Sequence, residues 1–391
     1  MFNFTQNPPL SLYVHVPWCV HKCPYCDFNS HEVKNEIPER AYVDALITDL
    51  EILLPEIWGR SVVSLFIGGG TPSLLSPDAI SRLLSAIKAR IPLLPQAEIT
   101  LEANPGSFEQ EKFSEFANAG INRLSIGIQS FDNELLRRLQ RIHDQTQAFS
   151  AIEIAHRAGF KNINLDLMYG LPGQTIDQAI FDIERAAKTD PSHISHYQLT
   201  IEPNTLFHTQ PPTLPDEDCI WAMQLKSQQL LQSARLEQYE VSAYATSRSQ
   251  CIHNLNYWTF GDYIGIGAGA HSKLTSAQKQ NITRHWRVKH PADYIKKTAT
   301  ATVDDPNHIS GTQTLSRANV CAEFMMNALR LTSGFSPNLF FHHTGMPIST
   351  IEQQLKHASN QGLLDYSVDK ICPTALGFQF HNDLIEIFIA S

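Results

Sequence analysis

Three cysteines lie within eight residues near the beginning of the sequence, at Cys19, Cys23 and Cys26. Their C-x3-C-x2-C spacing can place three thiolates around one iron–sulfur cube and leaves the fourth iron without a protein ligand. The alternative is three unrelated buried thiols, since cysteine packs well as a small hydrophobe. Lys22 and Pro24 between them favour an exposed loop instead. We therefore predict a [4Fe-4S] cluster whose open iron can bind a small molecule.

A glycine-rich segment, Gly68-Gly69-Gly70-Thr71-Pro72, follows an apolar run. Such a segment can be a simple tight turn, but after a strand it also lets backbone amides approach a ligand closely. Beside an open iron this arrangement favours S-adenosylmethionine, because its amino and carboxylate groups can chelate the metal. An electron from the reduced cluster can then cleave the carbon–sulfur bond and release a deoxyadenosyl radical.

The other four cysteines are scattered singly, at Cys219, Cys251, Cys321 and Cys372. They offer no paired spacing typical of a disulfide framework or a structural zinc site, which indicates a reducing compartment. No basic region followed by an apolar run opens the sequence, and no apolar segment approaches the roughly 18 residues of a membrane span. We expect a cytoplasmic protein without a membrane span.

The composition is that of a globular protein with an acidic balance. Of 391 residues, 42% are hydrophobic, and 30 Lys and Arg stand against 39 Asp and Glu, a net charge of −9. No basic stretch offers the phosphate contacts that drive nucleic-acid affinity. Nucleic acid is therefore not expected as a partner.

Short β-branched runs alternate with longer amphipathic stretches over the first half of the chain, as in an α/β fold with a parallel sheet. The predicted strands are residues 12–16, 62–67, 98–102, 123–128, 163–168 and 194–199. Residues 38–54 and 77–91 between them have the apolar spacing of helices. Because reactive groups gather at the carboxyl ends of parallel strands, we expect the cysteine loop, the glycine loop, Glu102, Gln129 and Asp166 to meet at one mouth.

The pattern changes after about residue 250. We predict a barrel with the cluster at 1–250, a connecting segment at 251–314 and a C-terminal module at 315–391. Within the module, helices are expected at 317–331 and 348–361, and a hairpin at 371–389. A winged-helix-like module fits this pattern. Such modules often bind DNA, but the acidity of the chain favours a lid or docking unit.

Long motifs resemble the radical SAM superfamily and, within it, the oxygen-independent coproporphyrinogen III oxidase family. They span residues 13–17, 68–72, 102–105, 123–131 and 166–175, and the likeness extends to the C-terminal module. It implies a partial (β/α)6 barrel in which Cys19, Cys23 and Cys26 hold the cluster. Residues implied to contact the bound S-adenosylmethionine are Tyr13, Gly69, Glu102, Arg141 and Asp166. Those implied to border it or a second molecule are Tyr25, Gly70, Thr71 and Gln129.

The sequence departs from the decarboxylating oxidases in two respects. In both it resembles the HemW-type heme chaperone branch. Phe28 stands where the oxidases carry a further cysteine, and a signature segment runs from His253 to Trp258. Imidazole suits an axial iron position, and Tyr257 and Trp258 offer flat apolar surface for a porphyrin. The alternative is a core histidine with two packed aromatics. Cys251, and other histidines including His193 and His196, offer weaker ligand candidates that loop polarity or packing explains.

The resemblance implies a heme chaperone that binds heme and delivers it to acceptor proteins, such as respiratory hemoproteins, with transient membrane contact. Whether such a protein is also an enzyme stays open. One rival is an oxygen-independent coproporphyrinogen III dehydrogenase, which Phe28 disfavours, and another is a radical SAM enzyme with a different substrate. A cluster-dependent dimer is a further possibility.

Overall fold

The computed structural model describes residues 2–106 and 110–389, and its centre is one large sheet. Six parallel strands form the middle of the sheet, as predicted. In sheet order they are β1 (Leu10–Val16), β4 (Val62–Gly69), β5 (Leu93–Ala103), β6 (Arg123–Gln129), β7 (Asn162–Tyr169) and β8 (His193–Gln198). Along these strands, buried apolar residues alternate with polar ones such as Ser64, Glu98 and Asn164, so the two faces of the sheet differ in polarity.

Further strands extend both edges of this sheet. Beside β1 lie β11 (Asp262–Ile266), which is parallel to it, and then the antiparallel β12 (His271–Ser276), β13 (Asn281–Arg287) and β14 (Ile309–Thr314). Beside β8 lie β10 (Ala243–Ala245) and β9 (Glu237–Glu240). The predicted division at residues 250 and 314 stays a prediction, but β11 to β14 continue the same sheet as the barrel strands.

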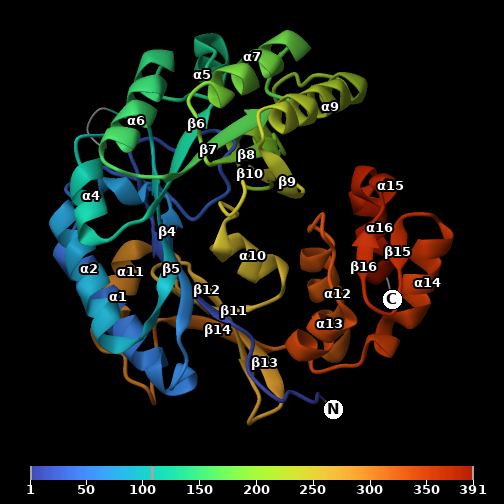
Figure 1. Ribbon diagram of the computed structural model, residues 1–391. Helices are drawn as coiled ribbons and strands as arrows, with labels where there is room; N and C mark the ends of the chain where they lie inside the picture. The colour runs from blue at the N-terminus through green and yellow to red at the C-terminus, as the bar shows by residue number, and fades with distance from the viewer. Residues whose placement is uncertain (1, 107–109, 390–391) are drawn as a thin grey trace.

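Helices cover the outer face of the curved sheet (Figure 1). They are α1 (Glu39–Leu53), α2 (Pro77–Arg90), α4 (Phe113–Ala119), α5 (Asn133–Arg138), α6 (Gln145–Arg157), α7 (Ile176–Ala187), α9 (Glu217–Ser233) and α11 (Pro291–Thr298), with the one-turn α8 (Leu206–Thr209) before α9. Local chemistry sets their starts: α2 begins at Ser76, whose side chain accepts from the third-residue amide, and α6 begins with a capping box between Asp144 and Gln147. Their apolar faces and the strands form the main core.

The C-terminal part is a small helical module on one side of the sheet (Figure 1). It comprises α12 (Arg317–Ala328), α13 (Pro337–Thr344), α14 (Glu352–Asn360), β15 (Leu364–Tyr366), β16 (Ile371–Pro373), α15 (Ala375–Gln379) and α16 (His381–Ile389). The two predicted helices are confirmed. The hairpin predicted over 371–389 is wrong, because residues 371–373 pair back to β15 and the remainder is helical.

Two local signals explain this error. Thr374 caps α15 by accepting from the Gly377 amide, and Leu384 and Phe388, four residues apart, bury one face of α16.

The module also shares an apolar core with the barrel part, since Phe4, Phe260 and Ile282 pack with its helices. In residues 2–106 and 110–389, no helix has the length and apolarity needed to cross a membrane.

Candidate functional site

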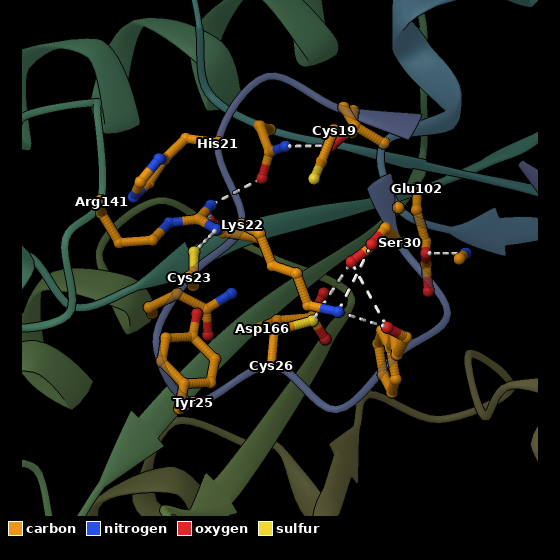
Figure 2. Close-up of a pocket in the computed structure, with 18 of the residues that line it drawn as sticks. Cys19, His21, Lys22, Cys23, Tyr25, Cys26, Ser30, Glu102, Arg141 and Asp166 are labelled. Carbon is orange, nitrogen blue, oxygen red and sulfur yellow. Dashed lines mark hydrogen bonds between the residues drawn. The ribbon is translucent and has the colours of Figure 1, made fainter. Parts of the chain in front are cut away.

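The cysteine loop leaves the carboxyl end of β1 and returns to it. β2 (Trp18–Cys19) pairs in parallel with β3 (His31–Glu32), which closes the base of the loop, and Cys23 accepts the Cys26 amide within it at 3.1 Å. All three cysteines are free thiols and line one cavity of about 290 Å³. Figure 2 shows the three thiols around this space. The structure therefore brings the predicted ligands together.

The glycine loop packs directly against the cysteine loop. Its Gly70 amide donates to the Val16 carbonyl at 2.8 Å, and the Thr71 amide donates to the Trp18 carbonyl at 2.6 Å. A Cβ atom on Gly70 would stand 2.3 Å from the Trp18 carbonyl oxygen, closer than real Cβ atoms come. The glycine is thus required for the contact between the two loops, as well as leaving the backbone open toward the cavity.

Two carboxylates from neighbouring parts of the sheet face the same cavity. Glu102, in β5, accepts the Gly69 amide at 3.0 Å, and burial together with the nearby Asp166 raises the pKa of Glu102 to about 8. Asp166, in β7, accepts from Ser125 at 3.0 Å and from Asn164 at 2.8 Å. Burial raises the pKa of Asp166 as well. Paired carboxylates with raised pKa values in a cleft are typical of a ligand site.

Arg141 places a positive charge beside the cysteine loop (Figure 2). One guanidinium nitrogen donates to the Cys23 sulfur at 3.6 Å, and another donates to Asn104 Oδ1 at 2.6 Å and to the Gly127 carbonyl at 2.7 Å. Its Nε is buried and has no hydrogen-bond partner among the described residues. Tyr25 also lines the cavity, and burial raises the pKa of its hydroxyl. The unpartnered Nε leaves the guanidinium able to bind an anionic ligand group.

Most residues expected at the mouth of the barrel line the cavity. They are Cys19, Cys23, Tyr25, Cys26, Gly69, Gly70, Thr71, Glu102, Gln129, Arg141 and Asp166. Gln129 ends β6 with a positive φ of 67°, a conformation that non-glycine residues rarely adopt. Sequence analysis missed the lining residues Asn104, Ser125 and Tyr197. Tyr197 lies at the carboxyl end of β8, where the convergence of strand ends alone points to it.

Tyr13 lies outside the set of residues that line the cavity. Its hydroxyl contacts His15 Nδ1 at 3.0 Å, and its ring lies beside the stacked pair of Phe66 and His253, with centroid distances of 6.2 and 6.3 Å. The other nitrogen of His15 contacts the Asn29 carbonyl at 2.9 Å. The strand register places Tyr13 beside Phe66 and Phe66 beside Thr100, on the face of the sheet that carries Glu102, but the Tyr13 hydroxyl is bonded to His15.

The aromatic segment is the helix α10 (Ile252–Trp258), away from the cysteines. His253 is buried, its Nδ1 contacts Ser64 Oγ at 3.1 Å, and its ring stacks on Phe66 with centroids 4.9 Å apart. Burial and the charge of Arg123 lower the pKa of His253 to about 3. Tyr257 packs against His253 with centroids 5.0 Å apart. In this conformation His253 has the environment of a neutral core histidine.

The other candidate residues also have partners in the structure. Trp258 holds the Arg330 guanidinium 4.3 Å from its ring centre. Cys251 donates its thiol hydrogen to Glu98 at 3.3 Å, and burial raises its pKa to about 12. His193 and His196 are buried within β8, so packing rather than loop polarity explains them.

The residues around the cavity fit an iron–sulfur cluster better than a single ion. In the part of the chain that the structure describes, no three His, Cys, Asp or Glu side chains are arranged to hold one metal ion. A cubane is larger, because each thiolate binds a different iron. Three thiols that line one cavity, with room for a ligand and with the unpartnered Arg141 Nε beside them, satisfy that requirement. Cys19, Cys23 and Cys26 are the residues that could hold such a cluster.

Comparison with known proteins assigns the family. A model of the radical SAM superfamily matches residues 13–186, and a model of the HemN C-terminal domain matches residues 315–380. The heme chaperone HemW of Escherichia coli (strain K12) is 46% identical over 383 residues, covering 98% of this chain and 99% of that protein. The chain belongs to the HemW family. HemW of Bacillus subtilis (strain 168) is 32% identical over 97% of this chain and 99% of that protein.

A solved relative confirms the predicted fold. The coproporphyrinogen III oxidase HemN from Escherichia coli, a radical SAM enzyme, superposes with a TM-score of 0.81 at 23% identity, covering 98% of this chain and 90% of that one. At that identity the likeness establishes the architecture alone. The α/β partial barrel with an appended C-terminal module is thus the radical SAM fold that the sequence motifs predicted, in a member of the HemW family.

Proposed function

We propose that the protein is a heme chaperone, which binds heme and delivers it to acceptor proteins. The observation that carries this proposal is the 46% identity to the heme chaperone HemW of Escherichia coli over nearly the whole of both chains. Phe28 supports it, because this residue borders the cavity where the decarboxylating oxidases carry a further cysteine. We place the protein in the cytoplasm and propose respiratory hemoproteins as acceptors, reached by transient membrane contact.

The cavity is proposed to hold a [4Fe-4S] cluster on Cys19, Cys23 and Cys26, with S-adenosylmethionine bound beside it. When bound, this pair supplies electron transfer and radical chemistry. The chain itself contributes binding and orientation: Glu102 and Asp166 can accept ribose hydroxyl groups, and Arg141 can bind a carboxylate. Tyr25, Gly70, Thr71 and Gln129 would border this ligand or a second molecule. Gly69 would face the ligand, and Tyr13 would act through its hydrogen bond to His15.

Heme is proposed to bind at α10, with His253 as an axial ligand and the rings of Tyr257 and Trp258 against the porphyrin. His253 is buried, with 4% of its surface exposed, and bonded to Ser64. Heme coordination therefore requires α10 to move so that the imidazole becomes accessible. Because His253 is neutral, its free imidazole nitrogen is available as a metal ligand once it is exposed.

Heme titration of the cluster-loaded protein, followed by mixing with a heme-free acceptor hemoprotein, tests the function. We expect a shifted Soret band on binding and loss of that band as the acceptor takes up the heme. His253→Ala should weaken binding, whereas His357→Ala, on the exposed face of α14, should leave it unchanged. No Soret change with the wild-type protein would contradict the proposal.

The alternative function is that of an enzyme, a coproporphyrinogen III dehydrogenase, because the protein shares its overall fold with HemN. An anaerobic assay with coproporphyrinogen III, S-adenosylmethionine and a reductant decides between the two. Formation of protoporphyrinogen would favour the enzyme. Absence of product with an intact cluster would leave the chaperone as the supported function. Deoxyadenosine release that depends on another substrate would indicate a different radical reaction.

A further inference from the structure

A continuous chain of buried hydrogen bonds joins the cavity to the start of α10. It begins at Asp166, whose Oδ1 accepts from Asn164 Nδ2 at 2.8 Å. Asn164 Oδ1 lies 2.6 Å from His193 Nδ1, and His193 Nε2 lies 2.8 Å from the Tyr239 hydroxyl. The Tyr239 oxygen accepts the Cys251 amide at 3.3 Å, immediately before α10. The four links cross from β7 through β8 and β9 to the helix.

The chemistry of these groups fixes the direction of every link. The Asn164 amide nitrogen donates to Asp166, so its oxygen is the acceptor that faces His193. His193 must therefore carry its hydrogen on Nδ1, which leaves Nε2 to accept from Tyr239. Burial and the charge of Arg123 lower the pKa of His193, consistent with a neutral ring. All four donors thus point from α10 toward Asp166.

The chain is sealed from solvent along its length. Asn164, His193 and Tyr239 expose 2%, 0% and 5% of their surfaces. Ser125 and Ser195 make the further hydrogen bonds of Asn164 and Asp166. Ser125 accepts from Asn164 and donates to Asp166, and Ser195 donates to Asn164 Oδ1. In such a dry environment each hydrogen bond polarises the next, and an unmade one is costly.

The far end of the chain holds α10 in place together with Glu98. The Glu98 carboxylate accepts the Cys251 thiol and the amides of Ile252 and His253, at 3.2 to 3.3 Å, and faces Arg123 Nε at 3.8 Å. The first turn of the aromatic helix is therefore fixed by polar contacts that lead back to the cavity. An interior of apolar side chains would have provided no such directional connection.

We propose that Asn164, His193 and Tyr239 are positioning residues, which aim the Asp166 carboxylate into the cavity and connect its orientation to the first turn of α10. The Asp166 carboxylate is the final acceptor of this hydrogen-bond chain. A ligand that donates a hydrogen bond to Asp166 therefore changes the hydrogen bonds that hold α10. The consequence for S-adenosylmethionine and heme rests on the proposed function. The assignment of the hydrogen-bond chain does not depend on the proposed function.

The tautomer of His193 tests the chain without any ligand. In ¹⁵N NMR spectra of the cluster-loaded protein, with His193→Gln to assign the resonances, the ring should be neutral and protonated on Nδ1 between about pH 6 and 8. In Tyr239→Phe, the Nε2 resonance should shift because its donor is lost. A ring protonated on Nε2, or on both nitrogens, would overturn the proposal.

Amide hydrogen exchange and S-adenosylmethionine affinity test the connection between the two ends. Tyr239→Phe should speed exchange at residues 251–258 and weaken S-adenosylmethionine binding by about threefold to tenfold, the effect of one hydrogen bond. Asn164→Asp, which removes both donors and adds a second acceptor beside Asp166, should weaken binding more. Tyr244→Phe is the matched control, because this buried tyrosine of β10 contacts Gln228 instead.

Added S-adenosylmethionine should change exchange at residues 251–258 in the wild type and in Tyr244→Phe, but not in Tyr239→Phe. Equal behaviour of Tyr239→Phe and Tyr244→Phe would overturn the proposal. Failure of the wild type to bind S-adenosylmethionine would contradict the proposed function instead, and the tautomer and the exchange of the unliganded variants would still decide the role of the chain.

Discussion

The cysteine cavity and the α10 region differ in how their candidate ligand groups are paired. Around the cavity, Glu102 and Asp166 have raised pKa values, and the buried Arg141 Nε has no partner among the described residues. In the α10 region, His253 and Cys251 are buried and hydrogen-bonded to Ser64 and Glu98. The cavity is thus ready to receive a ligand, whereas the aromatic segment must first be released. We interpret the cavity as the resident cofactor site and α10 as a site that opens.

The largest expected effect is loss of the cluster from the cavity. Cys23→Ser removes one of three thiolates and should abolish cluster assembly, because an oxygen ligand is a poor substitute for a soft thiolate. Iron and sulfide analysis after anaerobic reconstitution should fall from about four of each per chain to near zero. Cys219→Ser, on α9 outside the cavity, is the control and should retain the full content. A full cluster in Cys23→Ser would remove the basis of the comparison.

Gly70→Ala should disrupt the contact between the glycine and cysteine loops. Its Cβ would lie 2.3 Å from the Trp18 carbonyl oxygen, and backbone atoms must move to relieve this clash. We expect the free energy of unfolding to fall by about 2 to 4 kcal/mol in chemical denaturation. Gly159→Ala, where φ is +89° and nothing lies within 4 Å, should cost only about 1 kcal/mol of backbone strain. Equal losses in the two variants would show that the loops do not pack as described.

Glu102→Gln should change the pH dependence of stability. Burial raises the pKa of Glu102 to about 8, whereas the unfolded state releases this proton above about pH 4.5. The folded state therefore binds the proton more tightly, and its stability falls as the pH rises from about 4.5 to about 8. Glutamine keeps an acceptor for the Gly69 amide and removes the charge. The cluster-free variant should therefore gain about 1 to 3 kcal/mol over the wild type at pH 8, and almost nothing at pH 5.

The control for this prediction is Glu184→Gln, an exposed residue of α7. Thermal or chemical unfolding at pH 5 and pH 8 measures the difference. If Glu102→Gln and Glu184→Gln respond alike, the carboxyl at the cavity is not held in an unfavourable environment.

The smallest expected effect concerns the contact between α10 and the C-terminal module. Trp258→Leu removes the ring beneath the Arg330 guanidinium and should lower the free energy of unfolding by about 1 kcal/mol. Arg330 also pairs with Glu240 at 2.9 Å, so the module should stay attached. Trp58→Leu is the matched control, because Trp58 is 84% exposed. A change larger than that of Gly70→Ala would mean that α10 is held mainly by the module.

Much of the cavity was predictable because its parts follow one simple rule. The cysteine spacing, the glycine loop and the carboxylates at strand ends are short-range signals, and the six parallel strands bring them to one mouth. Asn104 and Ser125 were missed because a polar residue in or after a strand has no distinctive spacing. The role of His193 was missed because its partners, Asn164 and Tyr239, are 29 and 46 residues distant in the sequence.

The outer parts of the fold were harder to predict. Strands β11 to β14 extend the sheet through long-range pairing, so a polar sequence between residues 275 and 314 gave little indication of strands. The three-residue strands β15 and β16 are too short for alternation to fix their positions. Tyr13 followed the motif, and the strand register places it on the same face of the sheet as Glu102, but its hydroxyl is bonded to His15 and it is not among the residues that line the cavity.

⁵⁷Fe Mössbauer spectroscopy of the anaerobically reconstituted protein, with and without S-adenosylmethionine, tests the central assignment most directly. Three cysteine ligands leave one iron different from the other three, so addition of S-adenosylmethionine should change the signal of about one quarter of the iron. A spectrum without a [4Fe-4S] cluster, or one in which S-adenosylmethionine changes none of the four irons, would contradict the account.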